Sequence, residues 1–370
     1  MSKYDIVKKI KNRELTRRQM LKAAAAAGVV ATTMPMQSMA QGSVNHFTWG
    51  GYDDPGMAGS FIEKHGEEAL KFSIFGDTEE AFMKMRGGYV PDTMHPCYSD
   101  IIRWARADLL HPFDTTRLSN WGDLYTDLKY MPMVRWGGNV WFAPIDWGDT
   151  SICYRTDLVT KNTDSWGMLW DKKLKGKIAV LDSAEDAWYA TAIYMGMDIG
   201  RMQDFTVEDV TKVYDKMREQ RSLVRLYSSD MTTLAQALAS GEVVAAMTWN
   251  ETQWAVNSEE TPTAFMSPKE GTLTWVCGAS IHKDAPNLDL AYDLVDALIS
   301  YDTGLYLVGE WGYGHSNQKA FESFSADDLA ERGLASDPMA HLAKGKFGNQ
   351  PPDEIHNAVQ QGWEEMISGF

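Results

Sequence analysis

The chain is poor in cysteine and lacks the motifs that mark most metal-dependent or nucleotide-binding enzymes. Its three cysteines, Cys97, Cys153 and Cys277, are an odd number without metal-binding spacing, so they permit at most one disulfide and are expected to be buried thiols. The eight histidines are scattered, and neither H-E-x-x-H, G-x-S-x-G nor a phosphate-binding loop occurs. We therefore expect a protein that is not an enzyme and that uses no metal and no cofactor.

The sequence also lacks an apolar run of roughly twenty residues, the length that spans a membrane. Its segment Ala23–Val30 is shorter, follows the paired arginines Arg17 and Arg18, and precedes Ser38–Ala40, which has the small-x-small form of a cleavage site. This order predicts that residues 1–40 are a twin-arginine export signal rather than a surface helix. No cysteine stands at the cleavage site to carry a lipid, so a freely diffusing periplasmic protein is expected.

Positive charge is scarce once the predicted signal is removed. The whole chain has a formal net charge of −16, and residues 1–40 carry eight Lys or Arg and two Asp or Glu, a net of +6, so the remainder carries −22. Such an acidic surface argues against nucleic acid and anionic membranes as partners and suits cationic or neutral ones. The charge alone identifies no ligand.

The remaining chain is longer than a single hydrophobic core usually allows, so two domains are expected. Strand and helix patterns alternate from Phe47 to about Leu110, and a second alternating set begins near Gly176. Such alternation predicts parallel strands covered by helices on both faces, an α/β fold. One helix of the second set has an ordinary glycine stop at Gly241.

An apolar, strand-like connection from Asn139 to Arg155 joins the two sets without a Gly/Ser linker, as a hinge would. We assign residues 43–147 plus 277–320 to lobe 1 and residues 148–276 plus 321–370 to lobe 2. Ligands of open α/β sheets bind beyond the carboxyl ends of the strands, so we expect the ligand in a cleft between the lobes.

Several aromatic residues stand at the ends of predicted strands or in the connection, namely Trp49, Tyr52, Trp147, Trp249 and Trp275. If strand ends face the cleft, these rings form a box around the ligand. A cation over an aromatic ring gains about 0.5–2 kcal/mol, so an alkylammonium ligand is the natural candidate. Each tryptophan taken singly is explained equally well by core packing.

A cation in a dry cleft also needs a carboxylate, and the best candidate is Asp186, which follows the strand predicted at 178–181. The segment Ser183–Asp186 also fits a capping box, in which the acid only satisfies the start of a helix. The local sequence leaves both roles open.

In order along the chain, the segments "FTWGGY", "PIDWGDTSICYR", "LKGKIAVLDSAEDAW", "GEVVAAMTWN" and "PKEGTLTWVCGASIHKDAPN" resemble the periplasmic polyamine-binding proteins of ABC importers, the spermidine/putrescine type. The resemblance implies a two-lobe, type II-like binding protein that closes on its ligand, passes it to an inner-membrane permease and catalyses nothing. It also implies a set of ligand contacts: Trp49, Tyr52, Tyr98, Ser99, Asp186, Trp249, Trp275 and Tyr313.

The departures from the family pattern concern charge. Gly50 and Gly51 stand where the family often has a polar or acidic residue, Ser183 replaces another acid, and Cys277 stands where polyamine binders carry an aspartate. A neutral cysteine cannot pair with an ammonium group, so only Asp186 clearly remains as an amine-binding acid.

We therefore expect a monomeric ABC-importer subunit that binds a polyamine or related small amine, such as putrescine or spermidine. The alternative ligand is a zwitterion such as γ-aminobutyrate, or a quaternary ammonium. A zwitterion needs an arginine, for which Arg221 and Arg225 are candidates, although both also fit an exposed helix end. A ferric-ion binder of the same class would need clustered tyrosine and histidine ligands, and the tyrosines are not adjacent in sequence.

Overall fold

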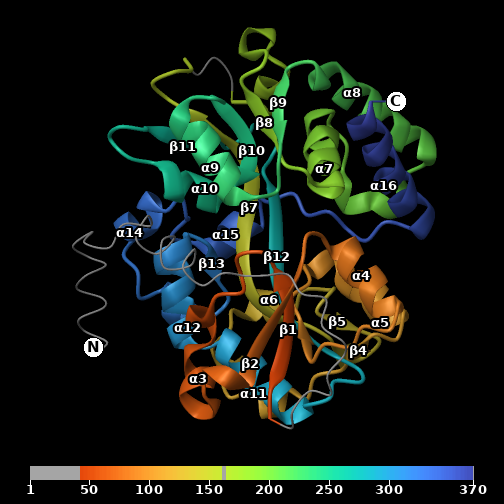
Figure 1. The fold of residues 1–370 in the computed structure, drawn as a ribbon, viewed down its shortest axis with the longest axis vertical. Coiled ribbons are helices and arrows are strands. Elements are labelled where there is room, and N and C mark those ends of the chain that lie inside the picture. The colour runs from red at the N-terminus through yellow and green to blue at the C-terminus, as the bar shows by residue number, and fades with distance from the viewer. Residues whose placement is uncertain (1–41, 161–163, 370) are drawn as a thin grey trace. The chain divides into compact units, whose positions relative to one another are not determined.

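The computed structural model describes residues 42–160 and 164–369, so the predicted export signal lies outside the described residues. Two long strands, β7 (Ala143–Arg155) and β12 (Leu273–His282), lie side by side at the centre of the sheet (Figure 1). The strand order β2-β1-β3-β12-β7-β10-β8-β9 places the N-terminal strands on one side of this pair and the later strands on the other.

The N-terminal part alternates as predicted. Strand β1 (Val44–Trp49) pairs in parallel with β2 (Leu70–Phe75) and β3 (Thr93–Met94). The intervening helices are η1 (Pro55–Ala58), α3 (Gly59–His65), η2 (Glu67–Ala69), α4 (Thr78–Arg86), η3 (Tyr98–Asp100) and α5 (Ile101–Arg106). Helix α4 begins at a fixed point because the Asp77 side chain accepts a hydrogen bond from the backbone N–H of Glu80.

The alternating pattern predicted to run to about Leu110 has its last helix, α5, end at Arg106. Asp108 adopts a left-handed conformation with φ of 57°, and the chain then enters β4 (Leu110–His111), which pairs with β12. Short elements lead from there to β7: η4 (Thr115–Arg117), η5 (Trp121–Asp123), α6 (Thr126–Lys129), β5 (Arg135–Trp136) and β6 (Asn139–Val140).

The two central strands differ from the predicted parallel arrangement. β12 pairs antiparallel with β7 and with β3, and β10 pairs antiparallel with β7. The expectation of parallel strands was therefore wrong for the centre of the sheet, although it is confirmed for the outer strands. Every residue of β7 is buried, which explains why its sequence reads as an apolar connection.

The second part also alternates. Its elements up to the sheet edge are η6 (Trp166–Trp170), η7 (Lys172–Leu174), β8 (Ile178–Val180), α7 (Ala184–Tyr194), η8 (Ile199–Asp204), α8 (Val207–Arg221) and β9 (Val224–Tyr227). They are followed by α9 (Met231–Ser240), β10 (Ala245–Trp249), α10 (Asn250–Val256) and β11 (Thr263–Phe265). β8 pairs in parallel with β9 and β10, and Gly241 ends α9 in a left-handed conformation, as predicted.

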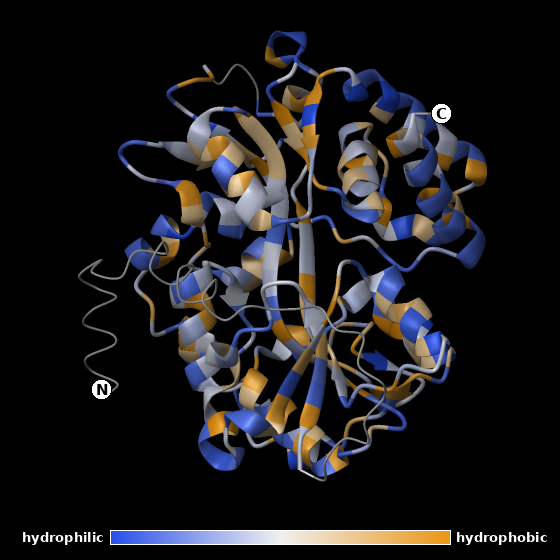
Figure 2. Ribbon diagram, in the orientation of Figure 1, coloured by the Kyte–Doolittle hydropathy of each residue, from blue (hydrophilic) through white to orange (hydrophobic). Residues whose placement is uncertain are grey.

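The C-terminal region is mostly helical. It contains α11 (Leu288–Leu298), α12 (Tyr301–Tyr306), a π-helical turn η9 (Leu307–Trp311), β13 (Gly314–His315), α13 (Gln318–Phe321), α14 (Ala326–Glu331), α15 (Pro338–Leu342) and α16 (Asp353–Ser368). In Figure 2 the strands of both parts carry much of the apolar colour, while α8 is largely hydrophilic.

Two clusters of buried apolar side chains form the cores of the two lobes. One draws on residues 44–147 and 276–342, the other on residues 152–273 and 355–366. Leu329, Leu334 and Leu342 pack in the first cluster, next to elements from the N-terminal part. The lobe boundaries given above remain a prediction.

Gly314 shows how closely β13 approaches β7. It lies opposite Trp147 in the strand register, and a Cβ at this position would collide with the indole ring. Gly314→Ala should therefore lower the free energy of unfolding by about 3 kcal/mol, measured by urea denaturation. Gly59→Ala is the matched control, because nothing lies within 4 Å of its added Cβ and its backbone is helical. Equal stability of the two variants would contradict this packing.

Candidate functional site

Four aromatic rings form a continuous group beside the central strands β7 and β12. Tyr52, in the turn after β1, is nearly parallel to Tyr313, with ring centroids 6.4 Å apart, and is tilted against Trp311 at 5.2 Å. Tyr313 in turn meets Trp275 of β12 edge to face at 5.0 Å. The structure thus brings together three predicted residues, and it adds Trp311, which the sequence analysis missed.

The glycines between the first two aromatics allow this arrangement. Gly51 has φ of +95°, a conformation that L side chains rarely adopt, and a Cβ there would lie 3.5 Å from the Trp311 ring. The missing side chain at this position is therefore explained by backbone conformation and by the approach of Trp311. Gly50 is exposed.

Two further predicted ligand contacts, Trp49 and Trp249, make no ring contact with this group in the described part of the chain. Trp49 packs edge to face on Phe75 at 4.7 Å, and its buried indole N–H has no hydrogen-bond partner among the described residues. Trp249 ends β10 and contacts both apolar clusters, so it lies where the two cores meet. Both side chains are only partly buried.

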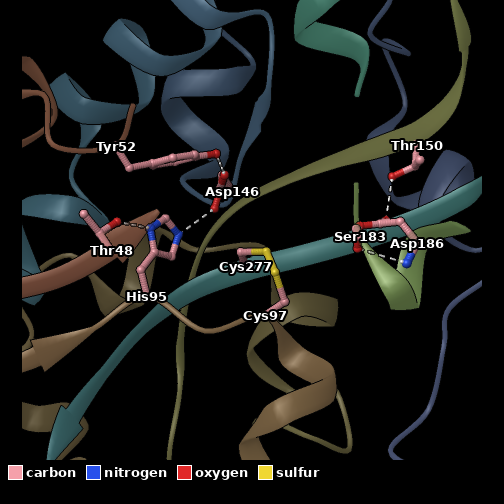
Figure 3. The surroundings of a disulfide bond; sticks show 9 residues. All are labelled: Thr48, Tyr52, His95, Cys97, Asp146, Thr150, Ser183, Asp186 and Cys277. Atoms are coloured by element: carbon pink, nitrogen blue, oxygen red, sulfur yellow. Dashed lines mark hydrogen bonds and ion pairs between the residues drawn. A yellow bond between two sulfur atoms is a disulfide. The ribbon is translucent and has the colours of Figure 1, made fainter. Parts of the chain in front are cut away.

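A buried carboxylate, Asp146 of β7, lies behind Tyr52 (Figure 3). The Tyr52 hydroxyl donates a short hydrogen bond to it, and His95 Nε2 lies 3.3 Å from its other oxygen. His95 Nδ1 is 3.0 Å from the Thr48 hydroxyl. Burial and the nearby Asp146 charge raise the pKa of Tyr52 well above its usual value, so its hydroxyl remains a donor. No sequence signal singles out this acid, because β7 also carries Asp149 and Arg155.

Asp186 lies in the first turn of α7. It takes part in the capping of this helix, and its carboxylate is held by hydroxyl groups. Its backbone N–H is 3.2 Å from Ser183 Oγ, so Ser183 caps the helix. Its carboxylate accepts hydrogen bonds from the hydroxyls of Ser183 at 2.8 Å and Thr150 at 3.2 Å (Figure 3). Burial raises the pKa of Asp186 to about 6, and the neighbouring Glu185 adds to this effect. The carboxylate is therefore ionised at pH 7, with neutral hydroxyls holding it.

Cys97 and Cys277 form a disulfide, so the expectation of buried thiols was wrong for these two residues. They are 180 residues apart, and the bond forms because the segment after β3 lies against β12. A pairing over this distance leaves no local sequence signal. Cys153 is a buried free thiol, as expected.

The residues after Cys97 face the contact between the two cores. The buried Tyr98 hydroxyl donates to the backbone carbonyl of Gly348 at 2.7 Å, and its ring meets Phe347 edge to face. Ser99 is half-buried in η3. Tyr98 therefore contributes to the contact between the two parts of the chain.

A charged cluster joins helices from the two parts. His356 of α16 lies 2.8 Å from Glu79 of α4 and 3.4 Å from Glu185 of α7, and Arg103 of α5 pairs with the same Glu79. Burial alone would lower the pKa of His356, but the hydrogen bonds with Glu185 and Glu79 outweigh it and raise the pKa to about 9. Burial, together with Glu185, raises the pKa of the nearby Asp100 to about 8.

These shifts predict a loss of stability at alkaline pH. A histidine with a raised pKa in the folded state stabilises the fold fully below pH 6.5, and this stabilisation is lost as the pH rises through about 9. His356→Gln should therefore lower the free energy of unfolding by roughly 2 kcal/mol at pH 6.5, and by clearly less at pH 9.5. Urea denaturation at both pH values measures the difference.

Lys212→Gln is the control for this prediction, because it removes an exposed ion pair with Glu208 and should change stability by less than about 0.5 kcal/mol at either pH. If His356→Gln lowers the free energy of unfolding by the same amount at pH 6.5 and pH 9.5, His356 is not charged in the folded protein.

The two candidate arginines lie on the surface. Arg225 of β9 is exposed and pairs with Glu242 at 3.0 Å, and Arg221 is exposed at the end of α8. In the described part of the chain, no group of three His, Cys, Asp or Glu side chains is placed to hold a metal ion. No described helix is both long and apolar enough to cross a membrane.

Comparisons with known proteins agree with this architecture. A family model described as bacterial extracellular solute-binding protein matches residues 75–332. The spermidine/putrescine-binding periplasmic protein of Salmonella typhimurium is 23% identical over 334 residues, which cover 89% of this chain and 93% of that protein.

Solved structures share the fold. The spermidine/putrescine ABC transporter substrate-binding protein PotD from Streptococcus pneumoniae superposes with a TM-score of 0.69 at 18% identity, covering 89% of this chain and 99% of that one. A GABA receptor superposes with a TM-score of 0.68 at 14% identity, covering 89% and 98%. Because these two proteins have different named ligands, the fold alone does not identify the ligand of this chain.

The fold is that of the two-lobe periplasmic binding proteins, as predicted. More specifically, the chain belongs to the family of bacterial extracellular solute-binding proteins.

Proposed function

We propose that the protein is the periplasmic solute-binding subunit of an ABC importer and that it binds a polyamine or related small amine between its two lobes. The observation that carries this proposal is Asp186: the carboxylate of a partly buried residue, held by two hydroxyls and paired with no Lys or Arg among the described residues. A cationic ligand would supply the missing positive charge. Membership of a solute-binding family supports a transport role rather than catalysis.

In this proposal the ammonium group of the ligand pairs with Asp186, and its alkyl chain lies against the rings of Tyr52, Trp275 and Tyr313. Trp249 would cover the ligand from the second lobe, because it lies where the two cores meet. The remaining predicted contacts, Trp49, Ser99 and Cys277, would border the cleft. Tyr98 would mainly help to join the two lobes, through its hydrogen bond to the backbone carbonyl of Gly348.

A zwitterionic ligand is the second candidate, and it is less well supported. It would require a positive side chain for its carboxylate. Arg221 and Arg225 are exposed, and Arg225 is already paired with Glu242. The aromatic rings alone would serve a quaternary ammonium equally well.

Export by the twin-arginine pathway, monomeric state and delivery to an inner-membrane permease complete the proposal. Export is supported by residues 1–40 of the sequence, and the periplasmic relative from Salmonella typhimurium supports the compartment. Delivery of the ligand to a permease is supported by the structural relative PotD, which is named as the substrate-binding protein of an ABC transporter.

Calorimetric titration with putrescine, spermidine and γ-aminobutyrate tests the ligand class. We expect binding of an amine, and about a 100-fold loss of affinity in Asp186→Asn, because the ligand cation would lose its charged partner. Asp182→Asn is the matched control: it removes a charge from the same segment but keeps an oxygen to accept from Trp363, and affinity should be unchanged. Absence of heat with every amine would refute the proposed function.

The affinity for putrescine should depend on pH through Asp186. Its pKa of about 6 means that the carboxylate must lose a proton to bind a cation below pH 6, whereas it is already ionised above pH 7. Affinity should be constant between pH 7 and 8 and fall by up to about tenfold per pH unit below 6. A profile that stays flat to pH 5 would show that Asp186 is not the partner of the cation.

A further inference from the structure

Cys277 stands where the polyamine binders carry an aspartate, and another acid, Asp146, lies directly beside it. In the antiparallel pair of β12 and β7, Cys277 is the register partner of Asp146. Residues directly opposite in such a pair project to the same face of the sheet, so the two side chains share a face. Figure 3 shows the Asp146 carboxylate next to the disulfide, with Asp186 on the other side of the disulfide.

Asp146 is completely buried, and it accepts hydrogen bonds within the protein. Its partners are the Tyr52 hydroxyl and His95 Nε2, and no Lys or Arg forms an ion pair with it in the described part of the chain. His95 Nδ1 lies 3.0 Å from the Thr48 hydroxyl, so the imidazole bridges Thr48 and Asp146. A buried carboxylate with no lysine or arginine partner is stabilised when a cation comes near it.

Tyr52 connects this charge to the cleft. Its hydroxyl donates to Asp146, while its ring lies in the group with Trp311 and Tyr313. Donation to a carboxylate makes a phenol ring more electron-rich, and a cation over such a ring is bound more strongly. The disulfide holds this arrangement in place, since Cys97 fixes the segment that carries His95 against β12.

We propose that Asp146, acting through Tyr52, supplies the second negative charge of the ligand site in place of an acid at position 277. The inference rests on the proposed function and specifies it: the ligand is a diamine, with one ammonium at Asp186 and the other over the ring of Tyr52. Asp146 is a positioning residue, because it faces the ligand through another side chain. A zwitterion would place its carboxylate against this charge and is disfavoured.

Calorimetry with putrescine, n-butylamine and γ-aminobutyrate tests the inference, because these probes share a four-carbon chain and differ in the second end. Wild-type protein should bind putrescine at least about tenfold more tightly than n-butylamine. Asp146→Asn should abolish most of this preference by weakening putrescine alone, whereas Asp186→Asn should weaken both amines. Equal weakening of both amines in Asp146→Asn would mean a merely structural role and would overturn the inference.

Asp92→Asn is the matched control, since Asp92 is also a buried carboxylate of the first core but accepts from the backbone N–H groups of Asn45 and Asn287. Its variant should keep the full preference for putrescine. If it loses that preference to the same extent as Asp146→Asn, the effect is not specific to Asp146 and the inference fails.

A second variant covers the case in which Asp146→Asn does not fold. Tyr52→Phe keeps the aromatic ring but removes the hydroxyl that connects it to Asp146. This variant should lose most of the preference for putrescine over n-butylamine, because Asp146 then no longer acts through the ring. An unchanged preference would overturn the inference.

The two proposals fail in different ways. If wild-type protein binds no amine at all, the proposed function is wrong. If it binds amines but does not prefer putrescine over n-butylamine, or prefers γ-aminobutyrate, the function stands and only the assignment of Asp146 is wrong.

Discussion

The antiparallel pairing of β7 with β12 is the constraint on which the rest of the structure depends. The two strands run through both halves of the sheet, so the register between them decides which residues of the two lobes meet. The same register puts Cys277 beside Asp146 and Trp275 beside Gly148. At Gly148 a side chain would collide with the Trp275 ring, so the small residue is required for the ring to lie there.

Around this pair, two carboxylates accept hydrogen bonds and have no lysine or arginine partner among the described residues. Asp186 has two hydroxyls, and Asp146 has a phenol and an imidazole. By contrast, the charges that join the lobes at Glu79, Arg103 and His356 are paired with one another. The charges that join the lobes are therefore paired within the protein. In the proposed site, a cation would be the positive partner of Asp186 and Asp146.

The sequence analysis predicted what depends on local patterns. The alternation of strands and helices, the stop at Gly241 and the start of α7 next to Asp186 follow from hydrophobic periodicity and from capping residues. It missed what depends on contacts between distant segments: the disulfide, the antiparallel centre of the sheet and the approach of Trp311 to Tyr52. Asp146 escaped notice because its place opposite Cys277 depends on the register between two strands far apart in the sequence.

The most direct test of this account is a crystal structure of the protein with putrescine. The account predicts one ammonium group within hydrogen-bond distance of Asp186 and the other over the face of Tyr52, whose hydroxyl still donates to Asp146. A ligand whose second ammonium lies away from Tyr52, or a putrescine molecule that does not meet Asp186 at all, would contradict it.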